Sequence, residues 1–102
     1  MKTIRLIIHG HVQGVGYRDW LVKTAHLNRL QGWVRNRTDG TVETVLAGTN
    51  LGITACLEAC REGPPLARVV SIETLPWEEE VAPGFEQRQT ASPTRQDQSK
   101  RL

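Results

Sequence analysis

The chain has 102 residues, of which 38% are hydrophobic and 24% are charged. This composition allows one small two-layer domain but not two independent cores. No run approaches the roughly 20 apolar residues of a membrane-spanning helix, and the first residues lead directly into a strand-like run instead of a signal peptide. We therefore expect a cytoplasmic protein that is neither secreted nor inserted in a membrane.

The formal net charge of +2 arises at one end of the chain. Residues 1–90 hold ten Lys and Arg against ten Asp and Glu, so the excess lies in the last twelve residues. Within the body, residues 1–37 carry seven basic groups against one acid, and residues 38–90 carry three against nine. A neutral body with one basic segment favours a local anion site over a nucleic-acid surface. We therefore expect no nucleic-acid partner.

The first third of the chain predicts a strand, a glycine-rich loop and a helix. Thr3–His9 is short, β-branched and apolar, with apolar side chains alternating onto one face as in a strand. Gly10–Gly16 contains three glycines and interrupts regular structure. From Tyr17 to Leu30, apolar residues recur at spacings of three and four, which predicts a helix.

The middle third predicts a hairpin followed by a second helix. Trp33–Arg37 and Thr41–Ala47 have strand composition and are joined around Asp39-Gly40, a strong hairpin signal. Thr49 or Asn50 can cap the helix that follows. Its apolar residues repeat at helical spacing until a Gly-Pro-Pro sequence ends it.

The last third predicts two strands and a tail. Arg68–Leu75 forms the first strand, Pro76–Gly84 is an acidic turn region, and Phe85–Thr90 forms a short edge strand. Residues 91–102 have no apolar period and predict a disordered C-terminal tail that follows a single domain over residues 1–90.

This order of elements predicts the fold class. Strand, helix, strand, strand, helix and strand (βαββαβ) indicate an α+β protein, a ferredoxin-like split β-α-β sandwich. The sheet is expected to be mainly antiparallel, with both helices on one face. In a sandwich this small nothing requires a partner, so we expect a monomer.

The two cysteines, Cys56 and Cys60, are four residues apart within the second helix. This spacing matches neither a CxxC motif nor a paired zinc knuckle. We expect both to be small, reduced core residues, as buried cysteines usually are, and a reducing cytosol is the simplest compartment.

The stretch Gly10–Arg18 is the part of the sequence that carries chemistry. Glycines in a turn between a strand and a helix allow positive φ angles and close approach of a ligand to the backbone. The start of the helix adds unpaired N–H groups and the positive end of its dipole. Arg18 lies there, and a guanidinium can hold two phosphate oxygens. The pattern is equally consistent with a purely structural turn and a solvated arginine, so by itself it leaves both interpretations open.

Two motifs resemble the acylphosphatase family. Gly10-His11-Val12-Gln13-Gly14-Val15-Gly16-Tyr17-Arg18 is similar to that family's G-x-V-Q-G-V-G-[FY]-R signature. About fifteen residues later, Gly32-Trp33-Val34-Arg35-Asn36 precedes an Asp-Gly hairpin, as the family's second motif does. The resemblance covers roughly residues 3–90 in the right order and spacing.

The resemblance implies an activity and a role for each matching residue. The family hydrolyses small acyl phosphates to a carboxylate and inorganic phosphate, without a metal, cofactor or covalent intermediate. Arg18 would bind and orient the phosphate, and Asn36 would hold the attacking water. Backbone amides would complete the phosphate cradle, which gives the expected binding residues Gln13, Gly14, Val15, Gly16, Tyr17 and Arg18.

The sequence departs from the family pattern in two places. Where the family commonly has Leu-Gly-Leu before the second motif, this chain has Asn28-Arg29-Leu30, so the exit of the first helix is expected to differ. In the last strand, Gln87 follows Phe85-Glu86 where the family usually has an apolar residue. Neither departure involves Arg18 or Asn36.

Alternative functions are weaker. A non-catalytic anion- or nucleotide-binding module on the same fold would not need Arg18 and Asn36 together. An RNA-binding sheet would show an aromatic pattern on its strands, and none is present. His9 and His11 lack a third ligand, so we expect no metal site.

Overall fold

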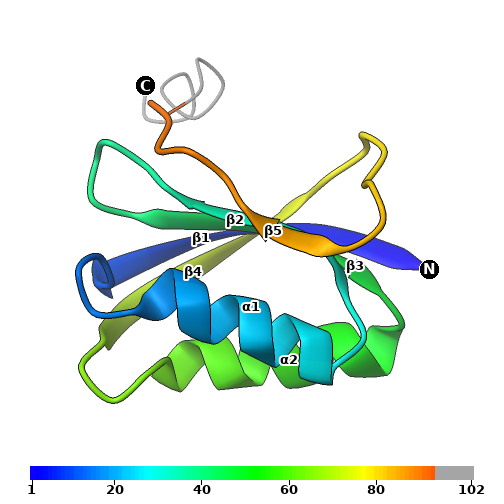
Figure 1. Ribbon diagram of the computed structural model, residues 1–102, viewed down its shortest axis with the longest axis horizontal. Helices are drawn as coiled ribbons and strands as arrows, with labels where there is room; N and C mark the ends of the chain where they lie inside the picture. The colour runs from blue at the N-terminus through cyan, green and yellow to red at the C-terminus, as the bar shows by residue number, and fades with distance from the viewer. Residues whose placement is uncertain (94–102) are drawn as a thin grey trace.

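The computed structural model describes residues 1–93, which form one sheet with two helices packed against one of its faces (Figure 1). None of the helices in this part of the chain is long and apolar enough to cross a membrane. The elements in chain order are β1 (Lys2–His11), α1 (Tyr17–Leu27), β2 (Gln31–Asn36), β3 (Val42–Gly48), α2 (Asn50–Glu62), β4 (Arg68–Pro76) and β5 (Phe85–Gln87).

The sheet has five strands in the order β4-β1-β3-β2-β5. β1 pairs with β3 and β4, and β2 pairs with β3, all antiparallel, whereas β5 runs parallel to β2. The predicted ferredoxin-like α+β fold is therefore confirmed. Because β1 and β2 are both antiparallel to β3, their C-terminal ends lie at the same end of the sheet. The loop after β1 and the last residue of β2 consequently lie at that end.

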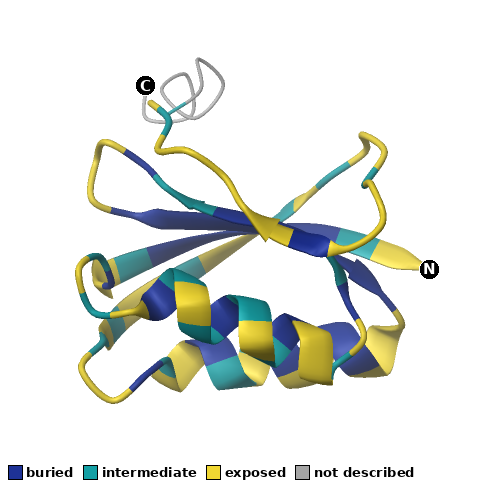
Figure 2. Ribbon diagram, in the orientation of Figure 1, coloured by how far each residue is buried: buried dark blue, intermediate teal, exposed yellow. Residues whose placement is uncertain are grey.

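The main core lies between the sheet and the helices. Alternate residues of the central strands face it, and Figure 2 shows these strands largely in the dark blue of buried residues. The second helix begins as predicted, because the Thr49 hydroxyl accepts a 3.0 Å hydrogen bond from the Gly52 N–H. The fully buried members of this core include Leu6, Ile8, Val34, Val42, Leu46, Tyr17, Leu21, Ala25, Cys56 and Cys60.

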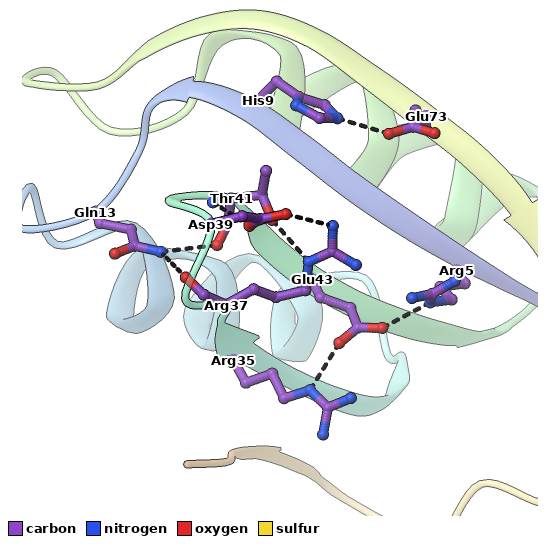
Figure 3. A network of polar contacts seen from close by, with 9 residues as sticks. All are labelled: Arg5, His9, Gln13, Arg35, Arg37, Asp39, Thr41, Glu43 and Glu73. Carbon is purple, nitrogen blue, oxygen red and sulfur yellow. Dashed lines mark hydrogen bonds and ion pairs between the residues drawn. The ribbon is translucent and has the colours of Figure 1, made fainter. Parts of the chain in front are cut away.

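The opposite face of the sheet carries ion pairs that cross the strands (Figure 3). Glu43 is 1% exposed and accepts hydrogen bonds from Nε of Arg5 at 2.6 Å and Nε of Arg35 at 2.7 Å. Arg35 and Arg88 lie over the Trp33 ring, 4.6 and 4.7 Å from its centroid. The fold therefore pairs basic residues of the first 37 with later acidic residues, and the charge segregation of the sequence is not kept in space.

β1 extends two residues beyond the predicted strand. Gly10 and His11, which we expected in the loop, pair with Val69 and Arg68 of β4 after a bulge at His9/Gly10. The φ of Gly10 is 132°, and a Cβ there would lie 2.1 Å from the carbonyl oxygen of Arg68. Gly10 is thus required for close strand packing, and the loop proper begins at residue 12.

α1 ends at Leu27 and not at Leu30 as predicted. The Asn28 N–H bonds to the carbonyl oxygens of Thr24 and Ala25, and Arg29 then adopts a left-handed conformation with φ 56°. Leu30 leaves the helix but returns to the core, where it is 3% exposed. Its apolar character therefore reflects the core and not the helix period.

Strand β5 is shorter than predicted, but backbone hydrogen bonds to the β2 segment continue further along the chain than predicted. β5 ends at Gln87, but the Ala91 N–H donates to the carbonyl oxygen of Asn36 at 3.1 Å, and the Thr38 N–H donates to that of Ala91 at 3.0 Å. Ala91, which we expected at the start of the tail, is therefore paired beside β2. The remainder of the predicted tail, from residue 94, lies outside the described residues.

Both cysteines are free, buried and four residues apart on α2, which confirms their prediction as reduced core residues. A hydrogen bond with Cys56 and burial raise the pKa of the Cys60 thiol well above its ordinary value. Cys60 therefore stays protonated, and its role is packing.

Candidate active site

The loop between β1 and α1 has the backbone geometry of an anion-binding nest. Gly14 and Gly16 have φ angles of 73° and 79°, and Val15 between them has an ordinary negative φ. Alternation of this kind turns successive N–H groups toward one point. A Cβ at either glycine would meet no atom within 4 Å, so positive φ and not close packing accounts for glycine at these two positions.

A small pocket of about 90 Å³ lies at this loop. Its volume is suited to a group the size of a phosphate, and it lies at the start of α1, where the first N–H groups have no partner within the helix. The residues that line it are Gly14, Gly16, Tyr17, Arg18, Asp19 and Gln87. Gly14, Gly16, Tyr17 and Arg18 were expected at the site, and the other two were not.

Arg18 has no ion pair within residues 1–93. Arg5 and Arg35 are bonded to Glu43, and Arg37 is bonded to Asp39. The guanidinium of Arg18, half-buried at the pocket, thus has its donors available for a ligand. A planar cation beside a nest of N–H groups is an arrangement that favours a phosphate.

Tyr17 contributes only its backbone to the pocket's chemistry. Its side chain is 1% exposed, and its hydroxyl donates a 2.6 Å hydrogen bond to the carbonyl oxygen of Cys60. Burial and the neighbouring Cys60 raise the pKa of this phenol, so it remains neutral. The side chain anchors the start of α1 to α2 and thereby fixes the loop.

Gln13 and Val15, expected among the binding residues, do not line the pocket. The Gln13 side chain is directed toward the β2–β3 hairpin, where Nε2 donates to the carbonyl oxygens of Arg37 and Thr41 at 2.8 and 2.9 Å (Figure 3). Gln13 therefore connects the loop to the hairpin. Glutamine's two donors are the only signal for this in the sequence, because the partners are 24 and 28 residues away.

Asn36 is the last residue of β2 and lies opposite Val42 of β3, which also pairs with Ile8 of β1. Residues directly opposite in antiparallel strands point to the same face of the sheet. The Asn36 side chain therefore points to the helix-covered face, as Ile8 does. It is half-buried and lies at the same end of the sheet as the loop, but it is not among the residues that line the 90 Å³ pocket.

A polar network closes the hairpin that follows Asn36. Arg37 is 3% exposed, and its guanidinium donates to the Thr41 hydroxyl at 2.8 Å and to Asp39 at 2.9 Å. Asp39 also accepts from the Thr41 N–H and hydroxyl at 3.0 and 2.6 Å. Partial burial acts to raise the pKa of Asp39, but the bonds from Thr41 and the Arg37 cation outweigh it, and the pKa is lowered.

His9 contacts an acidic side chain of β4. The His9 ring is 2.6 Å from a carboxylate oxygen of Glu73 on the face of the sheet opposite the helices. Within residues 1–93, no group of three or more His, Cys, Asp or Glu could hold a metal ion.

Comparison with known proteins agrees with this geometry. A family model described as Acylphosphatase matches residues 4–87. The acylphosphatase of Acidiphilium cryptum (strain JF-5) is 51% identical over 90 residues, which span 88% of this chain and 99% of that protein. The acylphosphatase of Rhodospirillum rubrum is 50% identical over 88 residues, 86% of this chain and 97% of that protein. The chain belongs to the acylphosphatase family.

A solved acylphosphatase structure has the same fold. The enzyme from Coxiella burnetii superposes with a TM-score of 0.81 at 34% identity, covering 85% of this chain and 92% of that one. Membership of the acylphosphatase family makes this chain a hydrolase of acyl phosphates, which are small molecules. The two acylphosphatase motifs end in Arg18 and Asn36. The strand directions bring the ends of both motifs to the same end of the sheet.

Proposed function

We propose that the chain hydrolyses small acyl phosphates by directing a water, held by Asn36, onto a phosphate bound by Arg18 and the loop amides. The observation that carries this proposal is Arg18, without an ion pair in residues 1–93, beside the nest formed around Gly14 and Gly16. Asn36 supports it because it lies at the same end of the strands as the loop, and its side chain points to the face of the sheet that the helices cover.

The phosphate is held before the reaction by groups that need no rearrangement. The Arg18 guanidinium donates to two phosphate oxygens, and the N–H groups from Gly14 to Arg18 donate to the others. These donors stabilise the charge that spreads over the equatorial oxygens during transfer. Tyr17 and Gln13 keep the loop in place from two sides.

The reaction then needs an oriented water and little else. The water oxygen bonds to phosphorus as the bond from phosphorus to the bridging oxygen breaks, and the bond's electron pair leaves with the carboxylate. One water proton stays on the new P–O bond and the other passes to a phosphate oxygen, which gives dihydrogen phosphate. A carboxylate is stable without protonation, so no general acid is needed. Asn36 has no useful basicity and acts by positioning.

We also propose that the protein works as a monomer in the cytoplasm, without a nucleic-acid partner or cofactor. The buried, reduced cysteines support a reducing compartment. The direct test is release of inorganic phosphate from benzoyl phosphate by chelator-treated protein, with its mass in solution measured alongside. We expect metal-independent turnover by a monomer. Binding of inorganic phosphate without turnover of any acyl phosphate would instead support a non-catalytic anion-binding module.

A further inference from the structure

Gln87 and Asp19 form one side of the phosphate pocket, although neither belongs to the residues expected there. Gln87 is the last residue of β5 and pairs with Val34 of β2. Its side-chain Nε2 donates a hydrogen bond to Oδ1 of Asp19, in the first turn of α1. Both residues line the pocket together with Arg18. The contact joins two segments 68 residues apart.

Asp19 presents an electrostatic problem for a phosphate site. Its carboxylate follows Arg18 directly in the chain and lines the same pocket. A carboxylate that turned toward Arg18 would occupy the donors that a phosphate needs and would also repel the phosphate. Within residues 1–93, however, the partner of Asp19 is the Gln87 amide, and Arg18 has no ion pair.

We propose that Gln87 is a positioning residue that holds the Asp19 carboxylate aside, so that Arg18 stays available for the substrate phosphate. This inference rests on the proposed function, in which Arg18 binds that phosphate. Gln87 is exposed, so a purely structural role would leave phosphate affinity untouched.

The sequence explains why this chain has the hydrogen bond between Gln87 and Asp19. The acylphosphatase pattern that the chain resembles usually has an apolar residue at this position of the last strand, and an apolar side chain has no donor. Here the residue is Gln87, and an acid occupies the first turn of α1. The departure at Gln87 and the acid at Asp19 form one interaction.

The test uses Gln87→Leu, with benzoyl phosphate as substrate and inorganic phosphate as competitive inhibitor. We expect KM and the inhibition constant of phosphate to rise together by about threefold to fivefold, the effect of one exposed charge, with a smaller change in kcat. Gln87→Glu, which cannot donate and adds a charge, should raise both constants at least as much. Gln89→Leu, the same change at an exposed position outside the pocket, should change neither.

The decisive arm is rescue by a second substitution. Adding Asp19→Asn to Gln87→Leu removes the charge that Gln87 restrains and should restore the inhibition constant to the wild-type value or below. Unchanged phosphate inhibition in both Gln87 variants, or no recovery in the double variant, would overturn the inference. If Arg18→Ala abolishes phosphate inhibition while the Gln87 variants do not alter it, only this inference fails. If Arg18→Ala leaves phosphate inhibition intact, the proposed function fails with it.

Discussion

The side-chain amide of Gln13 is hydrogen-bonded at 2.8 Å to the carbonyl oxygen of Arg37, the residue that follows Asn36. The same amide bonds to the carbonyl oxygen of Thr41. One side chain of the phosphate loop therefore fixes the strand end that carries the proposed water-positioning residue. The distance between the phosphate loop and Asn36 therefore depends on this contact.

Gln13→Ala is expected to lower kcat more than phosphate affinity. Loss of the two hydrogen bonds lets Asn36 shift relative to the loop, and a misplacement of about 1 Å can cost about 100-fold in rate. We expect kcat for benzoyl phosphate to fall by about tenfold to 100-fold, while the inhibition constant of phosphate changes by less than about threefold. Gln89→Ala is the matched control. An equal loss of affinity and kcat would contradict the assigned role.

Arg29→Gly is expected to stabilise the protein. Arg29 has φ 56° after the end of α1, and the left-handed conformation costs a residue other than glycine about 1–2 kcal/mol. Allowing for the greater freedom of glycine in the unfolded chain, we expect a gain of about 1 kcal/mol in the free energy of unfolding, measured with denaturant. Lys23→Gly, at an exposed position inside α1, should lose about 1 kcal/mol. A loss in Arg29→Gly would refute the prediction.

Glu43→Ala is expected to destabilise the fold by about 3 kcal/mol. The substitution removes the buried carboxylate that faces both Arg5 and Arg35, and breaking a buried pair leaves poorly compensated charge. Glu58→Ala removes an exposed carboxylate 3.4 Å from Arg61 and should cost less than about 0.5 kcal/mol. Equal midpoints of urea unfolding for the two variants would contradict this account.

Asp39 is expected to make stability depend on acid pH. Its pKa in the folded protein lies below the ordinary 3.8, so its contribution is complete above that pH and is lost as the pH falls through the folded pKa. The difference in unfolding free energy between wild type and Asp39→Asn should therefore be largest near neutrality and shrink below about pH 3.8. A difference that stays constant from pH 6 to pH 2 would show that the Asp39 charge does not matter.

Local sequence patterns predict the elements of this fold but not their ends. The alternation in β1 and the Asp39-Gly40 turn identify a strand and a hairpin, and both are present. Gly10 interrupts the strand pattern, yet the strand continues past it. A glycine is needed at this position because the backbone of β4 packs too closely for a side chain. Leu30 continues the helix pattern, yet it belongs to the core after the helix has ended.

The candidate site was predictable where its residues form local motifs. Arg18 and Asn36 end two recognisable motifs, and the glycines between β1 and α1 indicate the nest. The role of Gln13 and the contact of Gln87 with Asp19 depend on partners brought together only by the sheet order. No local pattern specifies such pairs.

The central claim is that Arg18 binds the phosphate and Asn36 positions the water. It is tested most directly by comparing Arg18→Ala and Asn36→Ala in benzoyl phosphate hydrolysis and in competitive inhibition by inorganic phosphate, with Arg61→Ala as a surface control. Loss of a charge-assisted bond at Arg18 should weaken phosphate inhibition by about tenfold to 100-fold. Loss of Asn36 should lower kcat by about 10²–10³ with phosphate inhibition nearly intact. Full activity in either variant would contradict the account.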